Sequence, residues 1–281
     1  MSGIYSSTEG ARLVRNRYQE LLRRWPVPHD QMRVPTSQGE TFVVACGPPM
    51  APPVVLLHGS MGNSARWLSE ASILAHRLRL YSVDIIGEPG LSAPSRPPLD
   101  SDAYARWLED VLGGLGVERA SFVGESLGGW MALDYAIRRP GRVDRLALRC
   151  PGGIGRQKWG VLPVALLLLP FGRQGRRLSA EFAIGTRLSR DNAEDLLLVS
   201  RHFRPRGVLP VFGDEALRRL TMPMTVILGA RDRMLDSRQT RRRLSETVPS
   251  AAVTMLPDAG HLLPDQSEAI LELLTSGATG R

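Results

Sequence analysis

The chain has 281 residues, of which 43% are hydrophobic and 23% are charged. These are ordinary values for a globular protein, so they exclude global disorder and favour one large α/β unit. The net charge of +8 comes almost entirely from arginines spread over the whole length, and no helix-turn-helix, zinc or RNA-recognition motif accompanies it, so nucleic-acid binding is not predicted.

Cysteine content and the length of apolar runs indicate the compartment. The two cysteines, Cys46 and Cys150, form neither a CxxC pair nor a Cys/His cluster, which argues against a disulfide framework and against a zinc site. The N-terminus has no apolar signal segment, and the apolar run 161–171 is shorter than the ~20 residues that a bilayer span requires. We therefore expect a cytoplasmic protein without a membrane span.

The first predicted element is an amphipathic helix within residues 5–25, which ends before Pro26. Two strand-like pieces within 32–46 flank the turn signal Ser37-Gln38-Gly39 and predict an antiparallel hairpin. From residue 54 onward, continuous apolar runs alternate with helical patterns, which predicts a parallel sheet covered by helices. The predicted strands of this sheet are 54–57, 80–86, 120–123, 143–148, 224–228 and 252–256.

The interval 151–220 breaks this alternation, because it contains helix-like patches at 162–169 and 193–203 but no clear strand. We interpret it as a helical cap, inserted into a core that consists of residues 1–150 and 221–281. A Gly-Gly turn at 152–153 and the stretch 173–177 are expected to form flexible borders. The cap arginines are expected to form a solvated face rather than a site for an anionic substrate; they stand at 173, 176, 177, 201, 204 and 206.

A nucleophile motif follows the predicted strand 120–123. The sequence Gly124-Glu125-Ser126-Leu127-Gly128 stands between that strand and a helical pattern at 130–137, as a nucleophile elbow requires. The glycines permit a sharp turn and a close approach of neighbouring backbone. The N-terminus of the following helix directs N–H groups toward the space beside Ser126, where an oxyanion can be stabilised. Ser126 is therefore the predicted nucleophile.

A serine needs a base that removes its proton, and the chain has five histidines. His261 lies in the loop after the last predicted strand and is the predicted general base. His58 directly follows a strand and is expected to brace the loop that it begins. The remaining three, His29, His76 and His202, lie in a proline-rich connection, an amphipathic stretch and the cap.

The base in turn needs a carboxylate that fixes its tautomer. Asp232 stands just past the strand 224–228, where side chains of a parallel sheet converge on a site, and is the predicted acid. Asp236 and Asp258 are its rivals, but the first is expected to cap the next helix and the second to form a turn. The resulting chain order is serine, acid, histidine.

Backbone amides are expected to stabilise the oxyanion. The N–H of Leu127 directly follows the nucleophile and is the first predicted donor. The second donor is expected in the loop after the strand 54–57, with Ser60 preferred, while Met61 would instead line the substrate pocket. Loss of one such donor typically costs ~100- to 1,000-fold in rate.

The motifs together resemble the α/β-hydrolase superfamily, through HGSMG at 58–62, GESLGG at 124–129, GARD at 229–232 and DAGH at 258–261. The segments 57–67, 83–87 and 107–116 are more narrowly similar to bacterial carboxylesterases of the naproxen-esterase type. This resemblance implies the α/β-hydrolase fold, with a mostly parallel sheet flanked by helices. A serine at 126 disfavours haloalkane dehalogenases and epoxide hydrolases, which use aspartate. The loop 84–92 has one residue more than the superfamily pattern D-x-x-G-x-G-x-S, and Asp84 in it is expected to be structural.

The sequence thus predicts a serine carboxylesterase that forms an acyl-enzyme on a small ester with a hydrophobic acyl group. Met61, Trp130 and Trp159 would line the acyl pocket or, in the interpretation that such residues more often support, pack the cores between helices, sheet and cap. No metal or cofactor is predicted, because no metal, nucleotide or flavin motif is present. Other functions stay open: a thioesterase or acyltransferase, a lyase or C–C bond hydrolase, and a receptor with residual hydrolysis. The sequence leaves the substrate and the oligomeric state open.

Overall fold

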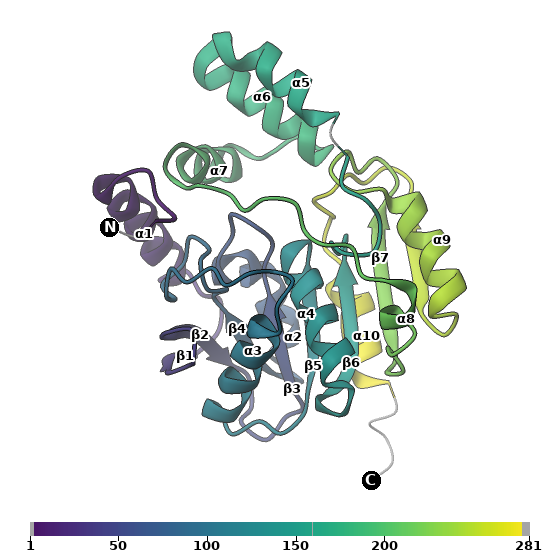
Figure 1. Ribbon diagram of the computed structural model, residues 1–281. Helices are drawn as coiled ribbons and strands as arrows, with labels where there is room; N and C mark the ends of the chain where they lie inside the picture. The colour runs from purple at the N-terminus through teal and green to yellow at the C-terminus, as the bar shows by residue number, and fades with distance from the viewer. Residues whose placement is uncertain (1–2, 159, 277–281) are drawn as a thin grey trace.

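The computed structural model describes residues 3–158 and 160–276. Within them, eight strands form one sheet in the order β1-β2-β4-β3-β5-β6-β7-β8 (Figure 1). The strands are β1 (His29–Val34), β2 (Thr41–Cys46), β3 (Pro53–Leu57), β4 (Arg79–Val83), β5 (Ala120–Glu125), β6 (Val143–Arg149), β7 (Met224–Gly229) and β8 (Ala252–Leu256).

The pairing of the strands confirms the predicted sheet. β1 pairs antiparallel with β2 around the predicted turn, and β2 pairs antiparallel with β4. All the remaining pairs, from β4 through β3 to β8, are parallel. β3 and β5 are nearly or fully buried along their length, as continuous apolar runs require in a sheet that is covered on both faces.

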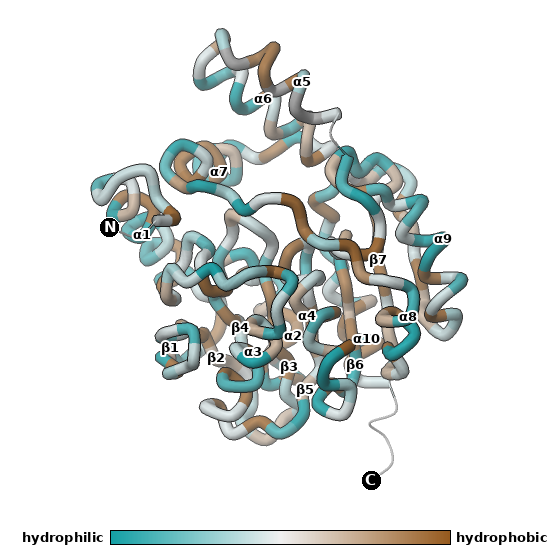
Figure 2. Tube along the Cα trace, viewed as in Figure 1, coloured by the Kyte–Doolittle hydropathy of each residue, from teal (hydrophilic) through white to brown (hydrophobic). Residues whose placement is uncertain are grey.

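Helices cover both faces of the sheet and divide the core in two. One apolar cluster joins the sheet to α3 (Ala103–Gly114), α4 (Leu127–Arg138) and α9 (Ser237–Thr247). The other joins it to the C-terminal part of α1 (Thr8–Leu22), to α2 (Leu68–Leu74) and to α10 (Ser267–Thr275). Figure 2 shows hydrophobic residues along the central strands and mostly hydrophilic residues along the outer helix α9. The nucleophile motif therefore stands between two packed layers.

The segment between β6 and β7 contributes α5 (Val161–Leu168), α6 (Gly172–Ile184), α7 (Arg190–His202) and the short α8 (Asp214–Leu217). α5 and α6 pack against each other, and Figure 1 shows them standing away from the sheet. Residues 173–177 lie inside α6, so the expectation of a flexible border there is wrong. Among the described residues, no helix is long and apolar enough to cross a membrane. The cap boundaries at 151 and 220 stay a prediction.

The N-terminal helix is unexpectedly part of this cap region. α1 packs against α7, and the Arg17 guanidinium donates to the Asp195 carboxylate at 2.6 Å. Just before α1 and just after α7, Tyr5 and Phe203 form an isolated antiparallel β-bridge, and their rings pack edge to face. Helical periodicity predicts that α1 buries one face, but it carries no information on which element covers that face.

Candidate active site

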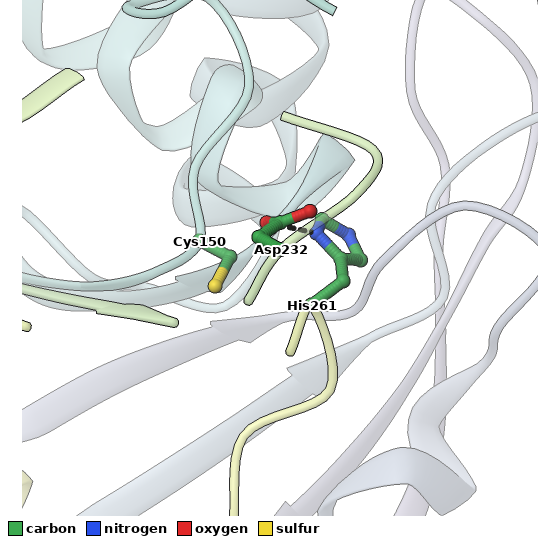
Figure 3. Close-up of side chains that lie close together, drawn as sticks. All are labelled: Cys150, Asp232 and His261. Atoms are coloured by element: carbon green, nitrogen blue, oxygen red, sulfur yellow. Dashed lines mark hydrogen bonds and ion pairs between the residues drawn. The ribbon is translucent and has the colours of Figure 1, made fainter. Parts of the chain in front are cut away.

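The structure brings the three predicted catalytic side chains together at the carboxyl edge of the sheet. Ser126 lies between β5 and α4 as the N-cap of the helix, Asp232 follows β7, and His261 follows β8. Ser126 Oγ lies 3.0 Å from His261 Nε2, so the hydroxyl can donate to this nitrogen. His261 Nδ1 lies 2.8 Å from Asp232 Oδ2, and a dashed line marks this contact in Figure 3. These two contacts form a continuous path for a proton from serine to histidine, with the carboxylate behind it.

The backbone around Ser126 is held in a strained turn. Ser126 has a φ of 52°, which residues with a side chain rarely adopt. A Cβ at Gly128 would lie 2.0 Å from the carbonyl oxygen of Leu57, so only glycine allows α4 to approach β3 this closely. The Ser126 N–H donates to Arg149 O at 3.0 Å, and this bond ties the turn to the end of β6. The elbow therefore presents Ser126 at the edge of the sheet.

The Asp232 carboxylate is oriented by its own loop. Its Oδ1 accepts from the backbone N–H groups of Met234 and Leu235, at 2.7 and 2.9 Å, which leaves Oδ2 for His261. Burial alone would raise the pKa of Asp232, but the hydrogen bond and charge of His261 and the two amides outweigh burial and lower it. Asp232 therefore stays ionised.

The two rival carboxylates have structural roles, as expected. Asp236 caps α9 by accepting from the Gln239 N–H at 3.0 Å. Asp258 lies in the turn after β8 and forms an exposed ion pair with Arg231. His58 also matches its expected role, because its Nδ1 contacts Gly59 O and its Nε2 accepts from the Ile85 N–H at 3.0 Å. Asp84 is structural too, since its Oδ1 accepts from the Tyr18 hydroxyl and the Ser64 N–H and its Oδ2 accepts from the Leu91 N–H.

His261, the predicted general base, lies against the end of α6. Burial disfavours the charged form of His261, but the hydrogen bond to Asp232 and the charges of Asp232 and Glu125 outweigh this effect and raise its pKa above the ordinary histidine value. The backbone N–H of His261 donates to Ile184 O, at the end of α6, at 2.6 Å. A Cβ at Gly260 would lie 2.1 Å from the same oxygen, so glycine is required where the cap approaches this loop.

The two predicted oxyanion donors flank the nucleophile. Leu127 is the first residue of α4, and a Cβ at Gly59, next to Ser60, would lie 3.5 Å from Ser126 Cβ. Within residues 3–158 and 160–276, neither the Ser60 nor the Leu127 N–H has a hydrogen-bond acceptor. The Met61 N–H, in contrast, donates to Glu88 Oε2 at 2.8 Å. Ser60 and Leu127 therefore stay the predicted donors to a substrate oxygen, and the Met61 N–H is already occupied.

Sequence reasoning missed a buried network of four charges beside the nucleophile. Glu125, directly before Ser126, accepts from Arg66 Nη2 at 2.8 Å, and Arg149 Nη1 donates to Glu70 Oε1 at 2.5 Å. Burial would raise the pKa of Glu125, but the charges of Arg66 and Arg149 lower it to about 2. Arg149 Nη2 also reaches Leu263 O, two residues after His261. The sequence gives one local signal of this network: Glu125 and Arg149 are charged residues that stand at the ends of apolar runs.

A cavity of about 580 Å³ lies beside the Ser60 loop. Its floor includes the charge network, and Met61 is among its lining residues. The side formed by α6, the loop after it and α7 is mostly apolar, with two polar residues, and consists of Ile184, Leu188, Asn192, Asp195, Leu196 and Val199.

Trp130 does not line this cavity. Its ring is 1% exposed and stacks on Phe212 with ring centroids 5.4 Å apart, and its Nε1 donates to Pro210 O at 2.9 Å. Trp130 therefore packs the core, which agrees with the second of the two interpretations given above. Trp159 lies outside the described residues.

One cap arginine differs from the expected solvated face. Arg173 is 72% exposed and fits that expectation, but Arg206 is 6% exposed and pairs with the buried Glu88 at 2.6 Å. The expectation is wrong for Arg206 because a buried carboxylate needs a cation to offset its lost hydration.

Cys150 completes the surroundings of Asp232 and His261. The thiol, a carboxylate oxygen and a ring nitrogen lie within 4.8 Å of one another, as three metal ligands would (Figure 3). Burial and the negative charge of Asp232 raise the pKa of the Cys150 thiol, however, and a protonated thiol is a poor ligand. Asp232 and His261 are also bonded to each other. The arrangement therefore suits proton transfer better than metal binding.

Comparisons with known proteins agree with this geometry. Residues 54–273 match the alpha/beta hydrolase family. The chain is 31% identical over 268 residues to the uncharacterized carboxylesterase nap of Bacillus subtilis (strain 168), covering 88% of this chain and 85% of that protein. The crystal structure of carboxylesterase CesB (YbfK) from Bacillus subtilis has a TM-score of 0.83 at 28% identity, covering 98% and 100% of the two chains. Naproxen esterase (carboxylesterase NP) from Bacillus subtilis has a TM-score of 0.80 at 26% identity, covering 97% and 96%.

Proposed function

Since the chain belongs to the alpha/beta hydrolase family, we propose that it hydrolyses carboxylic esters with Ser126 as nucleophile, His261 as general base and Asp232 as the orienting acid. The observation that carries this proposal is the pair of contacts from Ser126 Oγ to His261 Nε2, 3.0 Å, and from His261 Nδ1 to Asp232 Oδ2, 2.8 Å. The carboxylesterases among its relatives give the bond type.

In the first half of the proposed reaction, Ser126 Oγ attacks the acyl carbon while its proton passes to His261 Nε2. The carbonyl oxygen becomes an oxyanion and accepts from the Ser60 and Leu127 N–H groups. The C–O bond to the alcohol then breaks, and the alcohol leaves with the proton from His261. Ser126 is now acylated, and the charge of Asp232 has stabilised the imidazolium throughout.

In the second half, water occupies the place of the alcohol. His261 Nε2 takes a proton from the water as its oxygen attacks the acyl carbon, and the second tetrahedral intermediate uses the same two amides. Collapse of this intermediate breaks the bond to Ser126 Oγ, which recovers its proton from His261. The products are a carboxylic acid and an alcohol, and the enzyme returns to its initial state.

The substrate side of the proposal rests on the cavity. We assign its apolar cap wall to a hydrophobic acyl group and propose that the cap, predicted at 151–220, selects the substrate by the shape of that wall. Met61 extends this surface next to the oxyanion loop. The cytoplasmic location stays part of the proposal; both cysteines are buried and unpaired, which fits a reducing compartment.

The test is hydrolysis of p-nitrophenyl esters of increasing acyl length by the wild type, by Ser126→Ala and by a control, Ser245→Ala. Ser245 is exposed and its hydroxyl donates within α9, to Arg242 O. We expect wild type and control to be equally active and Ser126→Ala to be inactive while it melts at a similar temperature. Residual turnover by purified Ser126→Ala contradicts the nucleophile assignment. Formation of a new ester between the acyl group and an added alcohol would favour the acyltransferase alternative.

A further inference from the structure

A buried carboxylate lies behind the loop that carries the Ser60 amide. Glu88 Oε2 accepts from the Met61 N–H, one residue beyond Ser60, at 2.8 Å, and the Glu88 side chain has no exposed surface. Met61 has a φ of 63°, a left-handed conformation that a residue with a side chain keeps only where its surroundings demand it. The bond to Glu88 fixes the peptide between Ser60 and Met61. It thereby fixes the course of the chain at Ser60, which lines the cavity.

The second oxygen of the same carboxylate is bound by the cap region. Arg206 lies in the segment that leads from α7 to α8, and its Nε donates to Glu88 Oε1 at 2.6 Å. The other guanidinium nitrogens donate to Tyr104 Oη and to Ile86 O. Glu88 therefore joins the oxyanion loop to the chain that leaves α7, and α7 forms part of the cavity wall.

The chain beside this arginine contains a glycine in the left-handed region. Gly87 has a φ of 71°, and a Cβ on it would lie 2.6 Å from Ser95 O and 2.8 Å from Arg206 Nη2. Gly87 and Glu88 both lie in the loop 84–92, which has one residue more than the D-x-x-G-x-G-x-S pattern. The departure from that pattern thus coincides with the place where this loop receives Arg206.

The ion pair also controls the local charge. An unpaired Glu88 carboxylate would oppose the negative charge that develops on the substrate carbonyl oxygen, because it is buried and accepts from Met61, the residue next to Ser60. Arg206 is itself almost fully buried and cancels this charge. Pairing with Arg206 leaves the other carboxylate oxygen free to accept from Met61.

We propose that Glu88 is a positioning residue of the oxyanion hole and that Arg206 is its neutralising partner. The placement of the segment 203–213 and the competence of the Ser60 amide then depend on each other. This inference rests on the proposed ester hydrolysis, because it assigns the Ser60 loop to transition-state stabilisation. It adds a residue pair, joined across 118 positions of sequence, that no local motif contains.

The first test is Glu88→Ala, with Glu109→Ala as the matched control. Glu109 also accepts from a tyrosine and pairs with an arginine, Tyr135 and Arg142, but it lies away from the site. For Glu88→Ala we expect kcat to fall about 10- to 100-fold, below the ~100- to 1,000-fold cost of losing a donor outright, with KM within about twofold of the wild-type value. The control should match the wild type.

Two further readouts separate positioning from general damage. Ser126 Oγ adds to the carbonyl carbon of an aryl trifluoromethyl ketone, and the carbonyl oxygen becomes an oxyanion. The inhibition constant of this ketone should rise in proportion to the loss in kcat/KM. The acid limb of the pH profile should not move, because the charges that raise the pKa of His261 are those of Asp232 and Glu125 and not that of Glu88. An inhibition constant that stays at the wild-type value while kcat falls, or an effect confined to KM, overturns the proposal.

A second pair of variants keeps the test decisive if Glu88→Ala fails to fold. Arg206→Gln leaves the Glu88 charge uncompensated and should lower kcat at least about tenfold, whereas Glu88→Gln combined with Arg206→Gln is neutral and should recover most of that loss. Full activity of Arg206→Gln, or no recovery in the double variant, overturns the proposal. Wild type and Ser126→Ala are measured alongside: an inactive wild type refutes the proposed ester hydrolysis instead.

Discussion

Replacing Asp232 by asparagine tests how the carboxylate controls His261, because the structure predicts which way the new amide will face. Asp232 Oδ1 accepts from two backbone N–H groups, those of Met234 and Leu235. The asparagine oxygen must take this place, since an NH2 group there would face two donors. The NH2 group then takes the position of Oδ2, 2.8 Å from His261 Nδ1.

In that position the NH2 group donates to His261 Nδ1, which must then accept. The ring proton is then on Nε2, the nitrogen that faces Ser126. A protonated Nε2 cannot accept the serine proton. We expect kcat to fall roughly 10⁴-fold, the loss known for a triad with the wrong histidine tautomer, which corresponds to about 5.4 kcal/mol of transition-state stabilisation.

The assay is kcat and KM for a p-nitrophenyl ester, with Asp236→Asn as the matched control. Asparagine is as good a helix cap as aspartate, so the control should keep wild-type activity and stability. A loss smaller than tenfold in Asp232→Asn would refute the tautomer argument. A similar loss in Asp236→Asn would indicate that both changes act through the loop rather than through His261.

Three other predictions concern pH, packing and the cavity. In the proposed mechanism neutral His261 is the active form, and its pKa is raised, so kcat/KM should fall as the pH drops through a value above the ordinary histidine pKa of ~6.5. Glu125→Gln removes a negative charge and should move this acid limb to lower pH, whereas an upward move contradicts the assignment. Gly128→Ala places a Cβ 2.0 Å from Leu57 O and should cost on the order of 3 kcal/mol or more in urea unfolding, while Gly113→Ala, with open space around its Cβ, should be neutral or stabilising. Leu188→Trp should shorten the preferred acyl chain by filling the cavity, and Leu178→Trp, which is exposed and outside it, should leave chain-length preference unchanged.

The sequence alone was sufficient to predict the sheet and the positions of the candidate catalytic residues. Continuous apolar runs mark strands that are buried on both faces, and the residues at the carboxyl ends of parallel strands meet at one edge. Ser126, Asp232 and His261 stand three, four and five residues past the ends of the runs 120–123, 224–228 and 252–256, so their convergence could be inferred from local patterns. Gly128 could be recognised because a sharp turn against β3 leaves no room for a side chain.

Only the tertiary structure decided which distant groups compensate one another. Glu88 and Arg206, and likewise Glu70 and Arg149, are separated by 118 and 79 positions, and each is one of many charged residues that a sequence would place in solvent. The packing of α1 on α7 and the burial of Trp130 against Phe212 are equally non-local. The periodicity of apolar residues shows which face of an element is buried and where a strand ends, because both are set by residues that are adjacent in the sequence. The partner of a buried charge or ring depends on how the whole chain folds back on itself, and no local pattern encodes it.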